Sequence, residues 1–330
     1  MDILLISPPL SLDERYGKRN VGNIGGNLPP LGLAYIAAFL REKKFSVDII
    51  DGAVGDLSED EILEKIKIQN PKIIGFSAMT FTFHRAASFS KKIRAKFPHI
   101  LTIIGGHHAT LLPHQVLLEN PSFDLTVYGE GELTAWDIMQ KFEKHNFDRG
   151  KFLKDYHLLE TIQGIVFRKL KQTRMNPPRP LINNLDELPY PAWDLLPMDK
   201  YLPLPNQYLN KPVIHIVANR GCPFQCSFCS ANAVFGTKIR SLSPSRLVGM
   251  LEYVRDKFGA REISFWDDSL TVNKKWLFEF CRLLIKKKLG LTWSCYARVD
   301  CVDKQILSLM KKAGCWNIFY GFESGNQELL

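Results

Sequence analysis

Cysteine is absent from the first 221 residues of this 330-residue chain. All seven cysteines stand at or beyond position 222, and three of them lie within eight residues. An odd number of cysteines gathered in one region does not suit a disulfide framework and is typical of a metal site in a reducing compartment. The sequence therefore predicts that the thiol chemistry of this chain is confined to its C-terminal part.

Long apolar runs are also absent. No stretch reaches the roughly 18 apolar residues that a membrane-spanning helix needs. The first residues, 1–6, lack both the basic leader and the small-residue cleavage site of a signal peptide. We therefore expect no membrane span and a cytoplasmic protein.

The chain has little excess of one charge. Its 43 Lys and Arg against 34 Asp and Glu leave a net charge of +9. The lysines are scattered along predicted helices, as at Lys91, Lys92 and 286–288, where solvated faces and helix C-termini favour cations. This distribution makes a nucleic-acid partner unlikely, while a small acidic substrate is compatible with it.

Residues 1–150 alternate short β-branched runs with amphipathic stretches, which predicts a parallel α/β domain. In one predicted helix, Ala86, Phe89, Ile93 and Phe97 repeat at intervals of three and four before a proline. Five βα units fit the flavodoxin-like strand order, in which ligands sit beyond the carboxyl ends of the strands. The predicted strands are 3–6, 47–50, 73–76, 102–104 and 125–128.

The character of the sequence changes at about position 151. Residues 151–212 combine a predicted hairpin at 162–174 with a proline-rich stretch, which we expect to run extended across the surface as a connector. From 213 to 330 the βα alternation restarts, with predicted helix starts at Ser243, Asn273 and Asp303. Its predicted strands are 213–217, 263–266, 291–296 and 317–320.

The strongest motif lies directly after the first strand of this second domain. Cys222, Cys226 and Cys229 have the spacing CxxxCxxC. Three thiolates can hold three irons of a 4Fe-4S cubane and leave the fourth iron open to a small molecule. The alternative is a zinc site completed by His215 or a distant cysteine. Cys281, Cys295, Cys301 and Cys315 are interpreted as small buried residues.

This motif, with Phe228 just before its last cysteine, resembles that of the radical S-adenosylmethionine superfamily. The resemblance implies a partial (β/α) barrel whose cluster cleaves S-adenosylmethionine to a 5'-deoxyadenosyl radical. It also implies contacts to S-adenosylmethionine at the strand ends, although each such residue could instead be an ordinary cap or a surface ion pair. The implied contacts are Phe228, Asp267, Asp268, Arg298, Glu323 and Ser324.

A flavodoxin-like domain ahead of a radical domain resembles the cobalamin-binding members of that superfamily. The matching segments are 29–34, 77–80, 105–110 and 128–132. Paired glycines at a strand end let the backbone approach a ligand closely, although such turns also occur in domains that bind nothing. The implied cobalamin contacts are Ser77, Thr80, Gly105, Gly106, Tyr128, Gly129 and Glu130.

One loop departs from the cobalamin domain of the methionine-synthase type, which carries an Asp-x-His-x-x-Gly loop after its second strand. Here Ala53 stands where the cobalt-ligating histidine would fall, and Asp56 stands where the glycine would. We therefore expect any bound cobalamin to lack a histidine on its lower face. His107 and His108 are candidates for other contacts, although capping or surface roles are expected of them first.

The resemblance implies a cobalamin-dependent methyltransferase that acts on an unactivated carbon of a small molecule and takes electrons from a reductase, flavodoxin or ferredoxin. No catalytic residue is assigned. The alternatives are a radical oxidative cyclase or rearranging enzyme, and a non-catalytic cobalamin- and cluster-binding fragment. A methylthiotransferase is disfavoured because the N-terminal domain lacks cysteines for a second cluster. Four predicted strands against the family's six βα units suggest a barrel truncated after its fourth strand, and we expect such a chain to be an incomplete catalyst.

Overall fold

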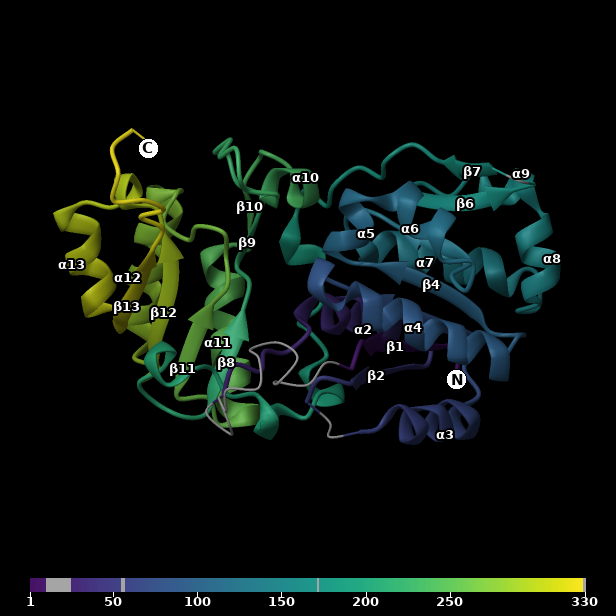
Figure 1. The fold of residues 1–330 in the computed structure, drawn as a ribbon. Coiled ribbons are helices and arrows are strands. Elements are labelled where there is room, and N and C mark those ends of the chain that lie inside the picture. Colours follow the sequence, from purple (N-terminus) through teal and green to yellow (C-terminus); the bar gives the residue numbers. More distant parts are fainter. Residues whose placement is uncertain (10–24, 55–56, 171, 329–330) are drawn as a thin grey trace. The chain divides into compact units, whose positions relative to one another are not determined.

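The computed structural model describes residues 1–9, 25–54, 57–170 and 172–328. The chain forms two compact units (Figure 1). The first contains residues 1–9, Pro29–Ile182 and Leu188–Lys200. The second contains residues 25–28, Asn183–Glu187 and the residues from Tyr201 onward.

A mixed sheet with the strand order β2-β1-β3-β4-β5-β6-β7 forms the centre of the first unit. Strands β1 to β5 are mutually parallel, so the predicted flavodoxin-like order is confirmed. In such a sheet the crevice for ligands lies outside the carboxyl ends of β1 and β3, where the strand order reverses. The parallel strands are β1 (Ile3–Ser7), β2 (Val47–Asp51), β3 (Ile73–Ser77), β4 (Leu101–Gly105) and β5 (Leu125–Val127).

Helices cover both faces of this sheet. Helices α2 and α7 pack against each other, with the rings of Phe39 and Trp136 edge to face at 6.3 Å. Side chains of α3, α4 and α6 join the core on the other face. The helices are α2 (Leu31–Glu42), α3 (Glu59–Gln69), α4 (Thr80–Lys96), α5 (His107–Leu111), α6 (Pro113–Glu119), α7 (Gly131–Glu143), α8 (Arg149–Lys154) and α9 (Tyr156–Leu159).

The periodicity read along α4 predicts its buried face correctly. Ala86, Phe89 and Ile93 are fully buried, and Phe97 packs partly buried against the same core. Because three- and four-residue spacing keeps side chains on one face of a helix, this stripe fixes which side of α4 meets the sheet.

The predicted hairpin belongs to the first sheet. Strands β6 (Ile165–Lys169) and β7 (Gln172–Met175) are antiparallel, and β6 pairs with β5. The sequence placed this hairpin within the connector. Its apolar residues Ile165, Val166 and Phe167 are buried, so the hairpin extends the sheet of the first unit beyond position 150.

The proline-rich connector does not run extended across the surface, and that prediction is wrong. It forms short 3₁₀ turns, and Trp193 is only 1% exposed. The Ala192 amide donates to the Ala34 carbonyl in α2 at 3.0 Å. The apolar residues between the prolines supply the burial that offsets the missing backbone donors. The turns are η2 (Leu185–Glu187), η3 (Trp193–Leu195), η4 (Met198–Lys200) and η5 (Pro205–Gln207).

Four parallel strands in the order β13-β12-β11-β8 form the sheet of the second unit. All four were predicted. A two-stranded antiparallel ribbon of β9 and β10 was not predicted. The strands are β8 (Val213–Ile216), β9 (Asn219–Arg220), β10 (Arg240–Ser241), β11 (Glu262–Phe265), β12 (Thr292–Ala297) and β13 (Cys315–Tyr320).

Three helices of the second unit begin where the sequence predicted, whereas the short helix Ala231–Phe235 was not predicted. The side chains of Ser243, Asn273 and Asp303 each accept a hydrogen bond from the backbone amide three residues later, which is the geometry of an N-cap. Helices α11 and α12 are neighbours, as are α12 and α13. The helices are α10 (Ala231–Phe235), α11 (Pro244–Phe258), α12 (Lys274–Lys287), η6 (Val299–Cys301) and α13 (Lys304–Lys312).

One buried carboxylate holds the amino edge of the second sheet together. Glu262 at the start of β11 is fully buried. Its Oε2 accepts from the amides of Leu209 and Asn210 at 2.8 and 2.7 Å and from the Thr292 hydroxyl at 3.0 Å. Its Oε1 accepts from the Trp316 indole at 2.7 Å. Every carboxylate oxygen therefore has a partner, as a buried charge requires.

None of the described helices is both long enough and apolar enough to cross a membrane.

Candidate functional site

The cysteine motif occupies the loop between β9 and α10. Backbone contacts hold the two ends of this loop together. Gly221 has φ +92° and a Cβ there would collide with the Lys238 carbonyl, so only glycine fits. The Cys222 amide donates to the Gly236 carbonyl at 3.1 Å. The Asn232 side chain donates to the Phe224 carbonyl at 2.6 Å. These contacts bring the two ends of the loop together and project its middle outward.

The three motif thiols lie near one another on this loop. Cys222 and Cys226 are half-buried and Cys229 is exposed. Burial has the largest effect on the pKa of Cys222 and raises it, a backbone hydrogen bond from Phe224 lowers it, and the charges of Asp268, Cys229 and Cys226 raise it further. Such a set of accessible thiols fits a cluster that bonds each thiolate to a different iron.

Among the described residues, no three His, Cys, Asp or Glu side chains converge closely enough to ligate one metal ion. His215, the zinc ligand considered from the sequence, is only 2% exposed on β8. Cys281 and Cys295 are buried, as predicted, whereas Cys301 and Cys315 are only partly buried.

The carboxyl ends of the four parallel strands share one edge, which places the predicted S-adenosylmethionine contacts on the same side as the cysteine loop. Phe228 is 69% exposed beside Cys229. Asp268 is exposed after β11. After β13, Glu323 is exposed, and the Ser324 hydroxyl accepts from the Asn326 amide at 3.0 Å. Their role in binding S-adenosylmethionine stays a prediction.

Asp267 differs from the expectation that its side chain contacts S-adenosylmethionine. It is 2% exposed, and its carboxylate accepts from the amides of Ala218 (3.1 Å) and Asn219 in the segment that follows β8. Burial raises the pKa of Asp267 to about 7, although these backbone donors act in the opposite direction. Asp267 therefore clamps the start of the cysteine segment to the end of β11.

Arg298 is the predicted contact that the structure brings directly to the motif. Its Nη1 lies 3.6 Å from the Cys226 sulfur, and its guanidinium lies 3.8 Å over the Phe224 ring. Its Nε and Nη2 donate to the two carboxylate oxygens of Asp300 at 3.0 and 2.9 Å. The predicted partner, the carboxylate of S-adenosylmethionine, would meet a guanidinium that already forks onto Asp300.

From the sequence, His215 was considered only as a ligand of the alternative zinc site. Neither of its ring nitrogens has a hydrogen-bond partner among the described residues, and burial lowers the pKa of His215 to about 3. It lies in register with Ser264 on β11, and Ser264 lies in register with Ser294 on β12. A polar row therefore crosses one face of the sheet; the only signal for it in the sequence is a histidine in an otherwise apolar strand.

In the first unit, the loops after β3 and β4 are joined at the predicted ligand edge. Gly106 has φ +91°, and a Cβ there would lie 2.8 Å from the Ala78 backbone and the Ser77 hydroxyl. The His108 amide donates to the Ala78 carbonyl at 3.1 Å, and its Nδ1 lies 3.2 Å from the Thr80 hydroxyl. The structure therefore brings together the two predicted hydroxyls and the glycine pair that begins at Gly105.

His108 also has an aromatic partner. Its ring stacks on Phe83 with centroids 4.1 Å apart, and burial lowers the pKa of His108. This arrangement favours a neutral imidazole that positions the loop after β4.

Two residues after β5 that were expected to contact cobalamin form hydrogen bonds to the protein backbone instead. Tyr128 is 8% exposed and its hydroxyl donates to the Asn176 carbonyl at 2.5 Å. Glu130 is 9% exposed and its carboxylate accepts from the Ile182 amide at 2.8 Å. Both side chains tie the helix-bearing core to the chain that follows β7. Between them, Gly129 has φ +76° and open space where a Cβ would stand.

The loop after β2 carries no histidine. The Ala53 amide donates to the Asp51 side chain at 3.1 Å, which makes a tight turn of the Asx type. Asp56, which replaces the glycine of the methionine-synthase type, lies outside the described residues.

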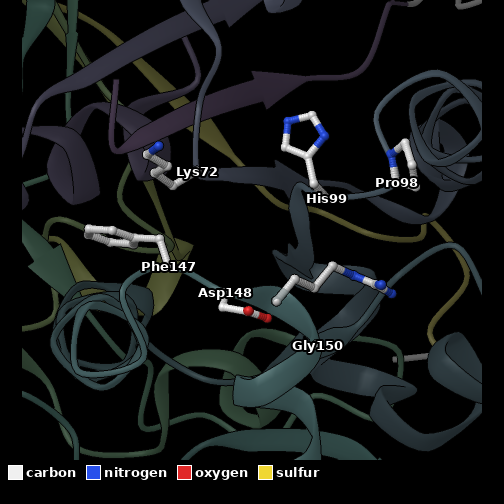
Figure 2. Close-up of a pocket in the computed structure, with 7 residues that line it drawn as sticks. Lys72, Pro98, His99, Phe147, Asp148 and Gly150 are labelled. Carbon is white, nitrogen blue, oxygen red and sulfur yellow. The ribbon is translucent and has the colours of Figure 1, made fainter.

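A cavity of about 380 Å³ lies at the other edge of the first sheet. Lys72 directly precedes β3 and His99 lies just before β4, so the cavity opens at the amino ends of the strands (Figure 2). The predicted cobalamin residues lie at the carboxyl ends, and this cavity is therefore separate from them. Its lining is Lys72, Pro98, His99, Phe147, Asp148, Arg149 and Gly150.

Two family models match this chain. The family model of the B12 binding domain matches residues 17–138, and that of the Radical SAM superfamily matches residues 216–330. An uncharacterized methyltransferase of Pyrococcus horikoshii is 36% identical over the whole chain, which covers 67% of that relative. The chain belongs to the radical SAM proteins that carry a B12-binding domain. The family resemblance seen in the sequence is thereby confirmed.

Other members of this family differ in their named activities. The anaerobic magnesium-protoporphyrin IX monomethyl ester cyclase of Rubrivivax gelatinosus is 33% identical over 92% of the chain, which covers 53% of that enzyme. The cytidylyl-2-hydroxyethylphosphonate methyltransferase of Streptomyces wedmorensis is 27% identical over 91% of the chain, covering 62% of it. The chain thus spans about half to two thirds of the length of these curated relatives.

Solved structures share the fold of this radical SAM protein. The cobalamin-dependent S-adenosylmethionine radical enzyme OxsB, with aqua-cobalamin and S-adenosylmethionine bound, superposes with a TM-score of 0.80 at 21% identity, over 99% of this chain and 45% of OxsB. The radical S-adenosylmethionine methyltransferase TsrM of Kitasatospora setae, with cobalamin and a [4Fe-4S] cluster bound, gives 0.76 at 15% identity, over 100% and 62%. The predicted fold class is confirmed.

Proposed function

We propose that this chain forms the cobalamin-binding and cluster-binding part of a radical S-adenosylmethionine methyltransferase that acts on an unactivated carbon of a small molecule. The observation that carries the proposal is the set of three accessible thiols of Cys222, Cys226 and Cys229 on a loop at the carboxyl edge of a parallel sheet. When bound, the 4Fe-4S cluster would supply the electron that cleaves S-adenosylmethionine to a 5'-deoxyadenosyl radical, and cobalamin would carry the methyl group.

The chain's own residues would hold and orient these groups. The three thiolates would ligate the cluster, and the strand-end residues Asp268, Glu323 and Ser324 would contact S-adenosylmethionine at the same edge. Asp267 would act indirectly, because its carboxylate fixes the backbone ahead of the cysteine loop. In this proposal the thiolates bind the cluster directly, whereas Asp267 only positions the loop that carries them.

Cobalamin would lie at the carboxyl edge of the first sheet, against Ser77, Thr80, Gly105 and Gly106. The open space beside Gly129 suits the close approach of a flat ligand. Because Ala53 replaces a histidine ligand, the cobalt(II) form bound to the full chain should show no nitrogen hyperfine splitting from an axial imidazole in its electron paramagnetic resonance spectrum. A clear imidazole splitting, or no binding of added hydroxocobalamin, would contradict this part of the proposal.

The cluster is tested by anaerobic reconstitution of the full chain. We expect about four irons per chain and a reduced-cluster signal that changes on adding S-adenosylmethionine. Replacing Cys222, Cys226 or Cys229 by Ala should abolish both. The matched control is Cys301→Ala, which removes a partly buried thiol outside the motif and should keep the iron. Iron retained by the triple replacement, or uptake of one zinc instead, would overturn the proposal.

A second candidate, radical oxidative cyclisation, is favoured by the 33% identity to the Rubrivivax cyclase. The two activities differ in the fate of the methyl group of S-adenosylmethionine. With added cobalamin kept in its cobalt(I) form by a chemical reductant, a methyltransferase should move a deuterated methyl group from S-adenosylmethionine to the cobalamin and release S-adenosylhomocysteine, measured by mass spectrometry. A cyclase should form 5'-deoxyadenosine without this transfer. A non-catalytic binding fragment should do neither.

The proposed chemistry also needs a source of electrons and a reducing environment. We propose a reductase, flavodoxin or ferredoxin as the electron donor and the cytoplasm as the site of action, because accessible cluster thiols must stay reduced before assembly. Reduction of the reconstituted cluster by added flavodoxin and its reductase, followed by its spectrum, would test the donor.

A further inference from the structure

Arg298 already contacts protein groups, whereas a residue that binds a ligand's carboxylate would be expected to have free donors. It follows β12 directly, and one edge of its guanidinium, Nε and Nη2, is engaged by Asp300. Arginine has five N–H donors in a fixed plane. The bidentate pair with Asp300 therefore orients the whole plane and directs the remaining nitrogen, Nη1, toward the cysteine loop.

Two contacts join this plane to the loop. Nη1 lies 3.6 Å from the Cys226 sulfur, and the guanidinium carbon lies 3.8 Å from the centre of the Phe224 ring. The Phe224 carbonyl is itself held by Asn232 at 2.6 Å. Arg298 therefore touches the central motif cysteine and a residue two positions before it, and fixes both against the end of β12.

We propose that Arg298 is a positioning residue of the cluster site, which orients the Cys226 thiolate and makes the bound cluster easier to reduce. This inference rests on the proposed function. Hydrogen bonds to the sulfurs and the net charge around them set the potential of an iron–sulfur cluster. A cation beside Cys226 stabilises the reduced cluster, which carries one more negative charge than the oxidised cluster.

Lysine could not replace Arg298 in this role. A planar guanidinium can stack on the Phe224 ring while it forks onto a carboxylate, whereas an ammonium is a point charge without a stacking face. The variant Arg298→Lys thus keeps the charge and removes the geometry, and Arg298→Met removes both at similar length. Phe224→Leu removes only the stacking face.

The experiment is a redox titration of the reconstituted full chain, followed by electron paramagnetic resonance. We expect Arg298→Met to lower the equilibrium constant for reduction of the cluster about tenfold. For a one-electron couple this corresponds to a reduction potential lower by about 59 mV. Arg298→Lys and Phe224→Leu should shift the potential in the same direction by less. The matched control is Arg255→Lys, since Arg255 pairs with Asp256 at 2.7 Å in the last turn of α11, away from the cysteine loop.

A second measurement follows the loop without any cluster. Hydrogen exchange of the apo-protein over residues 222–229 should be faster in Arg298→Met and Phe224→Leu than in the wild type and in Arg255→Lys. If Arg298→Met does not fold, the lysine and leucine variants decide the matter by the same two measurements.

The outcomes separate this inference from the function on which it rests. Wild-type protein that takes up no cluster would overturn the proposed function. Variants of Arg298 and Phe224 that hold about four irons but keep the wild-type potential and exchange rates would overturn the role of Arg298 and leave the proposed function standing.

Discussion

The two main sheets of this protein present similar polar residues at the carboxyl ends of their parallel strands but use them differently. In the second unit, the motif thiols are accessible on a projecting loop. In the first unit, Tyr128 and Glu130 after β5 turn inward and bond to backbone groups. Asp267 in the second unit behaves like these two. A polar residue at a strand end can therefore serve either as a ligand or as a clamp, and burial distinguishes the two roles.

The largest expected effect is a difference in stability between alanine replacements of two glycines at the carboxyl edge of the first sheet. Gly106→Ala would place a Cβ 2.8 Å from the Ala78 backbone at φ +91°, whereas Gly129→Ala meets nothing within 4 Å at φ +76°. We expect a loss of about 3 kcal/mol in the free energy of unfolding for Gly106→Ala, from strain and overpacking. Gly129→Ala should lose about 1 kcal/mol. Urea denaturation measures both, and equal losses would contradict the assigned packing.

The next effect concerns Asp267 and pH. Its folded pKa of about 7 exceeds the ordinary value of 3.8, so the unfolded chain ionises first as the pH rises. The carboxyl's contribution to stability is complete below about pH 4 and is lost as the pH rises through 7. Asp267→Asn does not titrate and should gain stability relative to the wild type by on the order of 2 kcal/mol between pH 5 and 7.

Urea denaturation at several pH values would measure this gain. The matched control is Asp300→Asn, because Arg298 holds the pKa of Asp300 at about 2, below the tested window. The difference between Asp300→Asn and the wild type should stay flat from pH 5 to 8. A flat difference for Asp267→Asn as well would show that Asp267 is ionised in the folded protein throughout.

The smallest effect tests the clamp role of Tyr128. Tyr128→Phe removes one hydrogen bond to the Asn176 carbonyl and should cost about 1 kcal/mol of unfolding free energy, with the affinity for hydroxocobalamin unchanged. Thr80→Val, at an exposed position of the same edge, should instead weaken that affinity with little loss of stability. Weaker cobalamin binding by Tyr128→Phe would show that Tyr128 contacts cobalamin and would contradict a purely structural role.

The sequence was sufficient to predict the strands of the two main sheets, the caps of α11, α12 and α13, and the thiol motif, because each has a local signal. Period-two and three-to-four spacing mark the elements, and a cap needs only a side chain three residues from an amide. The cysteine spacing similarly places three ligands on one short loop. These features depend on neighbours in the chain and so can be seen without the fold.

The roles of Asp267, Tyr128 and Arg298 could not be predicted in this way. Arg298 and Cys226 are 72 residues apart, and Tyr128 and Asn176 are 48 apart. The sequence predicts that such residues stand at strand ends but not which way their side chains turn. The prediction of an extended connector was wrong for the same reason. The burial of Trp193 depends on surfaces that distant segments of the chain form.

The network of Glu262 has a consequence for how the second unit assembles. Its four donors come from Leu209, Asn210, Thr292 and Trp316, which lie up to 54 residues from it along the chain. An intermediate without β13 would leave one oxygen of a buried carboxylate unpaired, and such a group is costly in an apolar interior. We therefore expect the four strands to form and melt as one cooperative unit, with no stable three-stranded state between.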